Sequence, residues 1–171
     1  MTPLLTLLAA STLMPSSPEL GVAEGRCRAN EPGPALLITV SGLEDRKGII
    51  RAELYPPNNQ DFLQDDNILV SNGKTFRRAI ERVPATGPVR LCLRVPAPGR
   101  YALSVVHDRN GGGAFSLSHD GIGFAGNPHL GLSKPKAAAV AVEAGAGLTP
   151  ITVVMNYRRG LFSFGPREDK Q

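Results

Sequence analysis

The sequence predicts a single all-β domain, a seven- to eight-stranded antiparallel sandwich, and three observations support this prediction. Short segments alternate apolar and polar residues with period two, which is typical of half-buried strands. Glycine, proline and asparagine separate these segments at spacings of about 8 to 12 residues. No segment keeps a 3.6-residue apolar period, so helices are not expected to build the core. A small barrel is the alternative architecture.

The first two expected strands cover residues 36–41 and 47–55, joined by a short hairpin. In each of them, alternate residues are apolar, and Pro56-Pro57 ends the second because proline donates no hydrogen bond to a ladder. Residues 58–67 are polar and predict a loop with one helical turn.

The remaining strands follow turn signals. Ser71-Asn72-Gly73 predicts a hairpin turn, and Pro96-Ala97-Pro98-Gly99 predicts a tight turn into the next strand of a second hairpin. The expected strands after residue 67 are 68–70, 76–83, 89–95, 100–108, 137–142 and 151–157.

Cys27 and Cys92 are predicted to form a disulfide. There is no Cys-x-x-Cys and no third soft ligand nearby, which argues against a metal site or a redox motif. The phase of strand 89–95 points Cys92 away from the core, so residues 24–34 are expected to form an N-terminal strap across or beside this strand. Two buried free thiols are the alternative.

Residues 1–23 predict a cleaved signal peptide. An apolar run from Leu4 to Met14 precedes Gly21-Val22-Ala23, which offers small residues where a signal peptidase reads them. The run has no preceding Lys or Arg, so an interfacial or frayed N-terminus is the alternative. It is shorter than the roughly 20 apolar residues that span a bilayer. We therefore expect a periplasmic or secreted protein without a transmembrane segment, with its sandwich at residues 35–158 and a tail at 159–171.

The charge distribution argues against nucleic acid as a partner. The formal net charge is +4, and it becomes +5 if residues 1–23 are removed, because Glu19 is their single charged side chain. The basic residues occur as scattered pairs such as Arg77-Arg78 and Arg158-Arg159, without interleaved aromatic residues or a recognition-helix pattern.

Three separated motifs resemble one bacterial family. Residues 47–55 read KGIIRAELY, residues 99–113 read GRYALSVVHDRNGGG, and residues 120–127 read DGIGFAGN before Lys134-Pro135. In this order they resemble exported bacterial proteins grouped as domain of unknown function 2141. The resemblance implies an immunoglobulin-like or transthyretin-like sandwich in the bacterial envelope and implies no activity.

The segment after the strand 100–108 is a candidate calcium loop. Asp108, Asn110 and Asp120 are the candidate ligands, because alternating oxygen donors around a glycine bend suit a hard cation. By the resemblance, Gly112 and Ser116 replace an Asn and an Asp of the family. Calcium binding is therefore expected to be weak or absent, and no cofactor is expected. In the alternative interpretation, Asp108 and Asn110 bond to the backbone of their own turn.

The best candidate ligand site combines the loops at one end of the sandwich, where binding residues tend to collect. Its candidate residues are His107, Asp108, Asn110, Phe124 and Asn127. No catalytic residue is predicted, because no Ser or Cys occupies a nucleophile motif and the phase of His107 places it at the end of a strand.

Three functions remain open. The leading hypothesis is a non-enzymatic binding or accessory module of the envelope, whose partner is an envelope protein or a small ligand. The second is an interaction protein that docks partners through the aromatic tail around Leu161, Phe162 and Phe164. The third is a weak calcium-binding domain or a hydrolase centred on His107 and Asp108.

Overall fold

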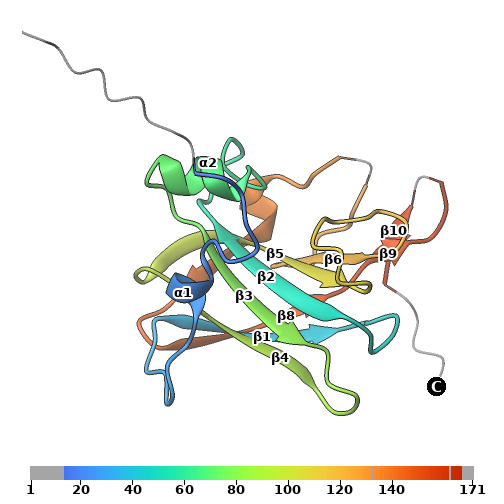
Figure 1. The fold of residues 1–171 in the computed structure, drawn as a ribbon, viewed down its shortest axis with the longest axis horizontal. Helices are drawn as coiled ribbons and strands as arrows, with labels where there is room; N and C mark the ends of the chain where they lie inside the picture. The colour runs from blue at the N-terminus through green and yellow to red at the C-terminus, as the bar shows by residue number, and fades with distance from the viewer. Residues whose placement is uncertain (1–13, 132, 162, 167–171) are drawn as a thin grey trace, which may run out of the picture.

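The protein is an all-β sandwich, as predicted (Figure 1). A computed structural model describes residues 14–131, 133–161 and 163–166. The first sheet has the order β4-β1-β8 and contains β1 (Ala35–Ser41), β4 (Val89–Arg94) and β8 (Leu148–Val154). The second sheet has the order β3-β2-β5-β6, with β7 also paired to β5.

The second sheet contains β2 (Ile49–Tyr55), β3 (Arg77–Arg82), β5 (Gly99–Asp108), β6 (Gly121–Phe124) and β7 (Ala141–Ala144). The other elements are α1 (Val22–Gly25), α2 (Asp66–Ser71), the 3-10 helix η1 (Ala137–Val140), β9 (Tyr157–Arg158) and β10 (Phe164–Gly165). The last two strands pair with each other.

Two hydrophobic clusters lie on opposite faces of the second sheet. Alternation along β5 places Leu103 in the cluster between the two sheets, whereas its neighbour Ala102 belongs to the other cluster. The second cluster is covered by α2 and η1, which contribute Leu69 and Val140. Tyr55 packs edge-on against Phe62 and Phe76, and Phe62 packs against Phe124 of β6. The members of this cluster are Tyr55, Phe62, Leu69, Phe76, Ala102, Phe124, Leu130, Ala137 and Val140. β2 is therefore buried on both faces near its end.

Two of the predicted hairpins are wrong because their strands lie in different sheets. β1 pairs with β4 and β8, whereas β2 pairs with β3 and β5, so the chain crosses between the sheets at residues 42–48. The turn at residues 95–98 likewise carries the chain from β4 in one sheet to β5 in the other. The alternation of apolar and polar residues determines which side chains of a strand face the core. It does not determine which of the two sheets the strand joins, because the inner faces of both sheets are apolar.

The secondary structure differs from prediction in two further places. Residues 68–70, predicted as a strand, belong to helix α2, and Ser71-Asn72-Gly73 ends this helix instead of forming a hairpin turn. The fully buried Leu69 anchors α2 on the second cluster, a tertiary contact that outweighs the strand propensity of Ile68 and Val70. The segment 137–142 is also mostly helical, since η1 precedes β7.

One pair of neighbouring strands in the sandwich is parallel, and the others are antiparallel. β1 and β8 run parallel, with Ala35 opposite Leu148 and Ser41 opposite Val154. β1 thereby lies between an antiparallel neighbour and a parallel one. The predicted strand 151–157 is divided, because β8 ends at Val154 and β9 begins at Tyr157.

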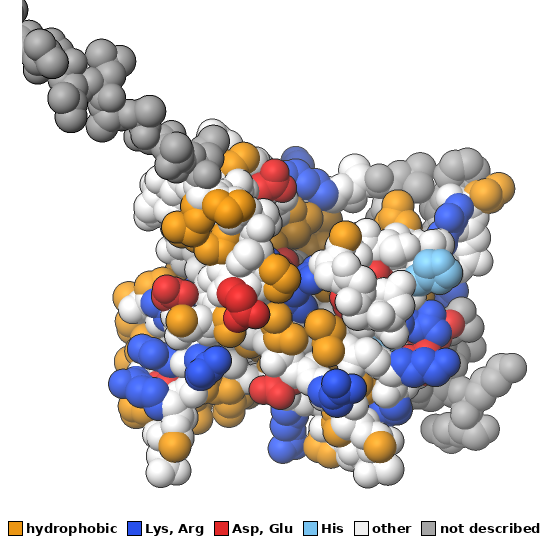
Figure 2. Space-filling view, viewed as in Figure 1, with side chains coloured by type: hydrophobic (Ala, Val, Ile, Leu, Met, Phe, Trp, Pro, Cys, Tyr) orange, Lys and Arg blue, Asp and Glu red, His pale blue; other side chains and the backbone are white. Residues whose placement is uncertain are grey.

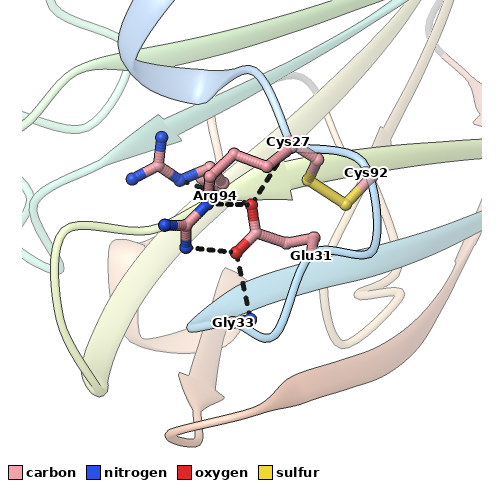
Figure 3. The surroundings of a disulfide bond; sticks show 6 residues. Cys27, Glu31, Gly33, Cys92 and Arg94 are labelled. Carbon is pink, nitrogen blue, oxygen red and sulfur yellow. Dashed lines mark hydrogen bonds and ion pairs between the residues drawn. A yellow bond between two sulfur atoms is a disulfide. The ribbon is translucent and has the colours of Figure 1, made fainter.

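The predicted Cys27–Cys92 disulfide is present (Figure 3). It attaches the N-terminal strap (residues 24–34) to β4, where Arg26 also forms an antiparallel bridge with Leu93. The strap therefore runs beside β4.

A carboxylate orders the strap next to the disulfide. The nearly buried Glu31 side chain accepts hydrogen bonds from Arg28 and from the backbone N–H of Gly33, at 2.8 Å and 3.0 Å to Oε1 (Figure 3). The hydrogen bond from Arg28 lowers the pKa of Glu31 to about 2. Arg94 of β4 adds a second cation at 3.5 Å.

Within the described residues, no helix is long and apolar enough to cross a membrane.

Candidate functional site

His107 lies at the end of β5 with no exposed surface. Its Nε2 atom donates to the carbonyl of Lys47 at 2.8 Å, because a carbonyl oxygen can only accept. Nδ1 therefore accepts the hydrogen bond of the Tyr157 hydroxyl at 2.7 Å. Burial lowers the pKa of His107, so that its ring is neutral at pH 7. Both ring nitrogens are thus occupied inside the fold.

Asp108 and Asn110 bond to the backbone of the loop that follows β5. Asp108 is buried, and its carboxylate accepts N–H hydrogen bonds from Gly111 at 2.7 Å, Gly112 at 3.1 Å and Gly113 at 2.8 Å. Oδ1 of Asn110 also accepts from Gly112, at 2.9 Å. The backbone-bonding interpretation of these two residues is therefore confirmed.

Asp120 holds the other end of the same loop. Its carboxylate is buried and accepts the N–H groups of Arg109 at 3.1 Å and Ser116 at 2.8 Å. Between them, Asp108 and Asp120 stabilise a loop at residues 109–119 that presents Phe115 and Leu117 at the surface.

We expect this loop to give no measurable thermal stabilisation in about 1 mM Ca²⁺. A site filled at 100 times its dissociation constant gains about 2.7 kcal/mol, which melting curves readily detect. Here the candidate carboxylates already accept backbone hydrogen bonds, and the described residues contain no cluster of three or more His, Cys, Asp or Glu side chains that could hold a metal ion. Melting in Ca²⁺ and in EDTA measures the effect.

A double variant provides the positive control for calcium. Gly112→Asn with Ser116→Asp adds oxygen ligands to the loop and is expected to create a Ca²⁺-dependent rise in melting temperature. Stabilisation of the unmodified protein by Ca²⁺, or its destabilisation by EDTA, would contradict the expectation and would make Asp108, Asn110 and Asp120 the residues to mutate first.

The other two candidate residues lie apart from the loop. Asn127 adopts φ 46° and uses its side chain to brace β8, accepting from the N–H of Val154 at 2.7 Å and donating to the carbonyl of Thr152 at 3.0 Å. Phe124 is buried in the second cluster, 5.9 Å from the Phe62 ring between centroids. Of the five candidate residues, Phe124 is the one that lines an apolar cavity beside β6.

This cavity, of about 410 Å³, lies beside β6 and is walled mostly by apolar side chains. Figure 2 shows hydrophobic side chains in a recess between the part of the molecule that carries α2 and the part that carries β9 and β10. Four of the large apolar side chains exposed on the described surface line it: Leu63 (36%), Phe115 (36%), Leu117 (56%) and Leu161 (76%). The other apolar side chains of the wall are Ile122, Phe124, Leu130, Pro135 and Phe164.

The ionisable side chains among the described residues of the cavity wall are both cations, Lys134 and Arg158. The Lys134 ammonium donates to the carbonyls of Asn59 at 3.2 Å and Phe62 at 3.0 Å. Arg158 donates through Nε to the carbonyl of Gly160 at 2.8 Å, and its side chain is exposed. Neither bond neutralises a positive charge, so this apolar cavity has a cationic rim.

Leu63 occupies an unusual backbone conformation at this cavity. Its φ is 61°, in the left-handed region that branched side chains rarely enter. Strained residues of this kind cluster where a side chain must be held in a given place. Here the conformation presents Leu63 to the cavity from the loop before α2.

One known protein family matches most of this chain. The sequence model of a family described as "Uncharacterized protein conserved in bacteria (DUF2141)" matches residues 38–152, more than half of the chain. The chain belongs to the DUF2141 family. No curated protein and no solved structure gives a significant match.

The part that matches DUF2141 supplies only some of the cavity. Leu63, Phe115, Leu117 and Lys134 lie within the matched residues, whereas Arg158, Leu161 and Phe164 lie beyond them. Cys27 and the strap also lie outside, so the disulfide joins the DUF2141 region to a segment that precedes it.

Sequence reasoning located Phe124 but missed most of the cavity wall. Leu63, Leu117 and Leu161 come from three connections without a periodic pattern, so nothing in the sequence indicated that they meet. One sequence signal was present nonetheless, since each of these leucines stands in a polar or glycine-rich connection. Large apolar residues mark binding surfaces when they gather into one exposed patch.

Proposed function

We propose that this protein is a non-enzymatic binding module of the bacterial cell envelope, and that its cavity binds an amphipathic carboxylate. The observation that supports the proposal most strongly is the combination of a mostly apolar wall with Lys134 and Arg158 as its ionisable residues. The apolar chain of the ligand lies against Leu63, Phe115 and Leu117, and its carboxylate lies at the cationic rim.

The apolar wall supports a ligand with a hydrocarbon chain. Ligand sites are concave, mostly apolar and roughly 300–1,000 Å³ in volume, and this cavity of about 410 Å³ has those properties. A surface patch that exposes Leu117 and Leu161 by more than half is unfavourable in water and gains about 25 cal/mol for each Å² that a ligand covers.

The charges of the rim support a negative head group. A carboxylate near Lys134 or Arg158 forms a charge-assisted hydrogen bond, which is stronger than a neutral one. An ammonium head group at the same place is repelled by two cations. A preference for anionic over cationic head groups is therefore the property that distinguishes this site from a non-specific apolar surface.

The state of the polar residues supports a binding role over a catalytic one. A general base needs a nitrogen or oxygen that can reach a substrate. Both nitrogens of His107 bond within the core, and the carboxylates of Asp108 and Asp120 accept backbone N–H groups. The hydrolase hypothesis centred on His107 and Asp108 would require these bonds to break.

The envelope location rests on two features. Residues 1–23 have the composition of an export signal. The Cys27–Cys92 disulfide is stable in oxidising compartments such as the periplasm and is rare in a reducing cytosol.

Calorimetric titration with dodecanoate, kept below its micelle concentration, tests the ligand class. We expect dodecanoate to bind at least about tenfold more tightly than dodecyltrimethylammonium, a difference of about 1.4 kcal/mol. Leu117→Asp places a negative charge on the cavity wall and is expected to weaken dodecanoate binding by about tenfold or more.

Leu148→Asp is the matched control, because Leu148 is 44% exposed in β8 and does not line the cavity. It should leave dodecanoate affinity unchanged. Equal binding of the two head groups, or equal affinity of the Leu117→Asp and Leu148→Asp variants, would contradict the proposed ligand site.

The alternative of a tail that docks a protein partner is favoured by one observation, the 76% exposure of Leu161. Phe164 of β10, however, pairs with Arg158 of β9 and packs against the second cluster. Leu161 and Phe164 of the described tail thus form part of the cavity wall. Phe162 lies outside the described residues. Leu117→Asp separates the two functions, because Leu117 lies outside the tail: a tail-docked protein partner would remain bound to this variant.

A further inference from the structure

The entry segment (residues 14–23) is packed onto the domain although its sequence has the composition of a cleavable leader. It follows the side of the domain that carries α2 and β3 and leads into α1 (Figure 1). Asn67 of α2 donates from its side chain to the carbonyl of Met14 at 3.0 Å, and the backbone N–H of Arg78 donates to the carbonyl of Gly21 at 2.9 Å. The segment is thus bonded at both ends.

Between these ends, two backbone carbonyls of the entry segment accept hydrogen bonds from the buried guanidinium of Arg78. The guanidinium of Arg78 donates through Nε to Glu53 at 2.8 Å and through Nη2 to Asp66 at 3.0 Å. Its Nη1 donates to the carbonyls of Ser17 at 2.9 Å and Pro18 at 3.0 Å. Arg78 is only 7% exposed, and a buried charge requires partners for its donors.

Close packing also fits this segment to the domain. Leu20 packs against the second cluster. Gly21 has φ 76°, and a Cβ atom there would lie 2.9 Å from Cδ1 of Phe76 and 3.0 Å from Cα of Arg77. Both the conformation and the contact therefore require glycine at this position.

Such a fit is not needed in a discarded leader. A signal peptidase reads small residues in an extended chain, before the domain has folded, and makes no demand on how those residues pack. The small residues Gly21 and Ala23 can equally be explained by packing, because Gly21 lies against β3 and Ala23 belongs to α1.

We propose that residues 14–23 are part of the mature domain, and that signal peptidase does not hydrolyse the peptide bond after Ala23. This inference rests on the proposed export to the envelope. Ser16 of the entry segment lines a smaller cavity, of about 200 Å³, together with the buried groups Glu53, Tyr55, Asp66 and Arg78. Leu63 lines both this cavity and the ligand cavity.

The N-terminus of the exported protein tests the proposal directly. The full chain is expressed with its own leader in a Gram-negative bacterium, purified from the envelope fraction and measured by intact mass. A chain that begins at or before Met14 keeps the bonds to Asn67 and Arg78 and supports the proposal. A chain that begins after Met14, including one that begins at Glu24, overturns it. Recovery of the protein from the cytosol alone would instead contradict export and leave dodecanoate binding to be judged separately.

Stability provides an independent measurement. With the disulfide intact, a chain that begins at Met14 is expected to melt at least about 4 °C higher than one that begins at Glu24. Gly21→Ala should lower the melting temperature of the longer chain by more than Gly73→Ala does. Gly73 is the matched control, because it has φ 65° and a Cβ atom there would meet nothing within 4 Å. Equal melting temperatures for the two chains, or equal effects of the two alanines, would show that the segment is not part of the domain.

Discussion

Reduction of the Cys27–Cys92 disulfide is expected to lower the free energy of unfolding by about 4 kcal/mol. The bond closes a loop with a sequence separation of 65 residues, and the loss of chain entropy in the unfolded state scales with the logarithm of that length. The bond also anchors the strap to β4, so that the ion pairs of Glu31 with Arg28 and Arg94 lose their support when it is broken.

Urea denaturation of the oxidised and reduced protein measures this difference. Cys27→Ala with Cys92→Ala is the control, since it removes the bond without adding a reductant and should lie close to the reduced protein. Equal midpoints for the oxidised and reduced protein, or two free thiols by mass in protein taken from the envelope, would contradict the prediction.

Gly48→Ala is expected to destabilise the fold by about 3 kcal/mol or more. Gly48 precedes β2 with φ 70°, and a Cβ atom there would lie 2.0 Å from the carbonyl oxygen of Asp108. The backbone conformation alone costs an L-residue about 1–2 kcal/mol, and overpacking adds about 1–3 kcal/mol. Because the contact is with the last residue of β5, the substitution also displaces the start of the loop 109–119.

Gly87→Ala separates the two contributions. Gly87 has φ 80°, and a Cβ atom there meets nothing within 4 Å, so its replacement should cost only the conformational contribution of about 1–2 kcal/mol. The comparison uses the free energy of unfolding of both variants in denaturant. Similar values for Gly48→Ala and Gly87→Ala would show that β5 and the residues before β2 move apart easily.

The sequence predicted the architecture because local alternation is a direct result of burial. Leu36, Ile38 and Val40 alternate in β1 because one face of a strand meets the core, and the same rule located β4 and β5. It could not predict which strands pair. Gly42 and Gly99 mark turns, but a turn between two strands of one sheet and a turn between two sheets use similar residues.

The candidate site was predicted less well, for a related reason. Asp108 and Asn110 could be recognised as loop-building residues, because short polar side chains bond to nearby backbone. Asp120 was predicted only as a metal ligand, and its bonds to the loop backbone were not predicted. The ligand cavity depends on contacts between Leu63, Leu117 and Leu161, which are far apart in the chain and come together only in the tertiary structure.

The parallel pairing of β1 with β8 sets the order in which the chain can acquire its structure. Ala35 is opposite Leu148, so one edge of β1 stays open until β8, more than 100 residues later, has been synthesised. Open strand edges promote aggregation, and pairings between distant residues form slowly. During synthesis from the N-terminus, the first sheet therefore closes after its last strand has left the ribosome. Under the proposed export, the first sheet would still be open while the chain crosses the membrane as an extended polypeptide, and it would close on the far side.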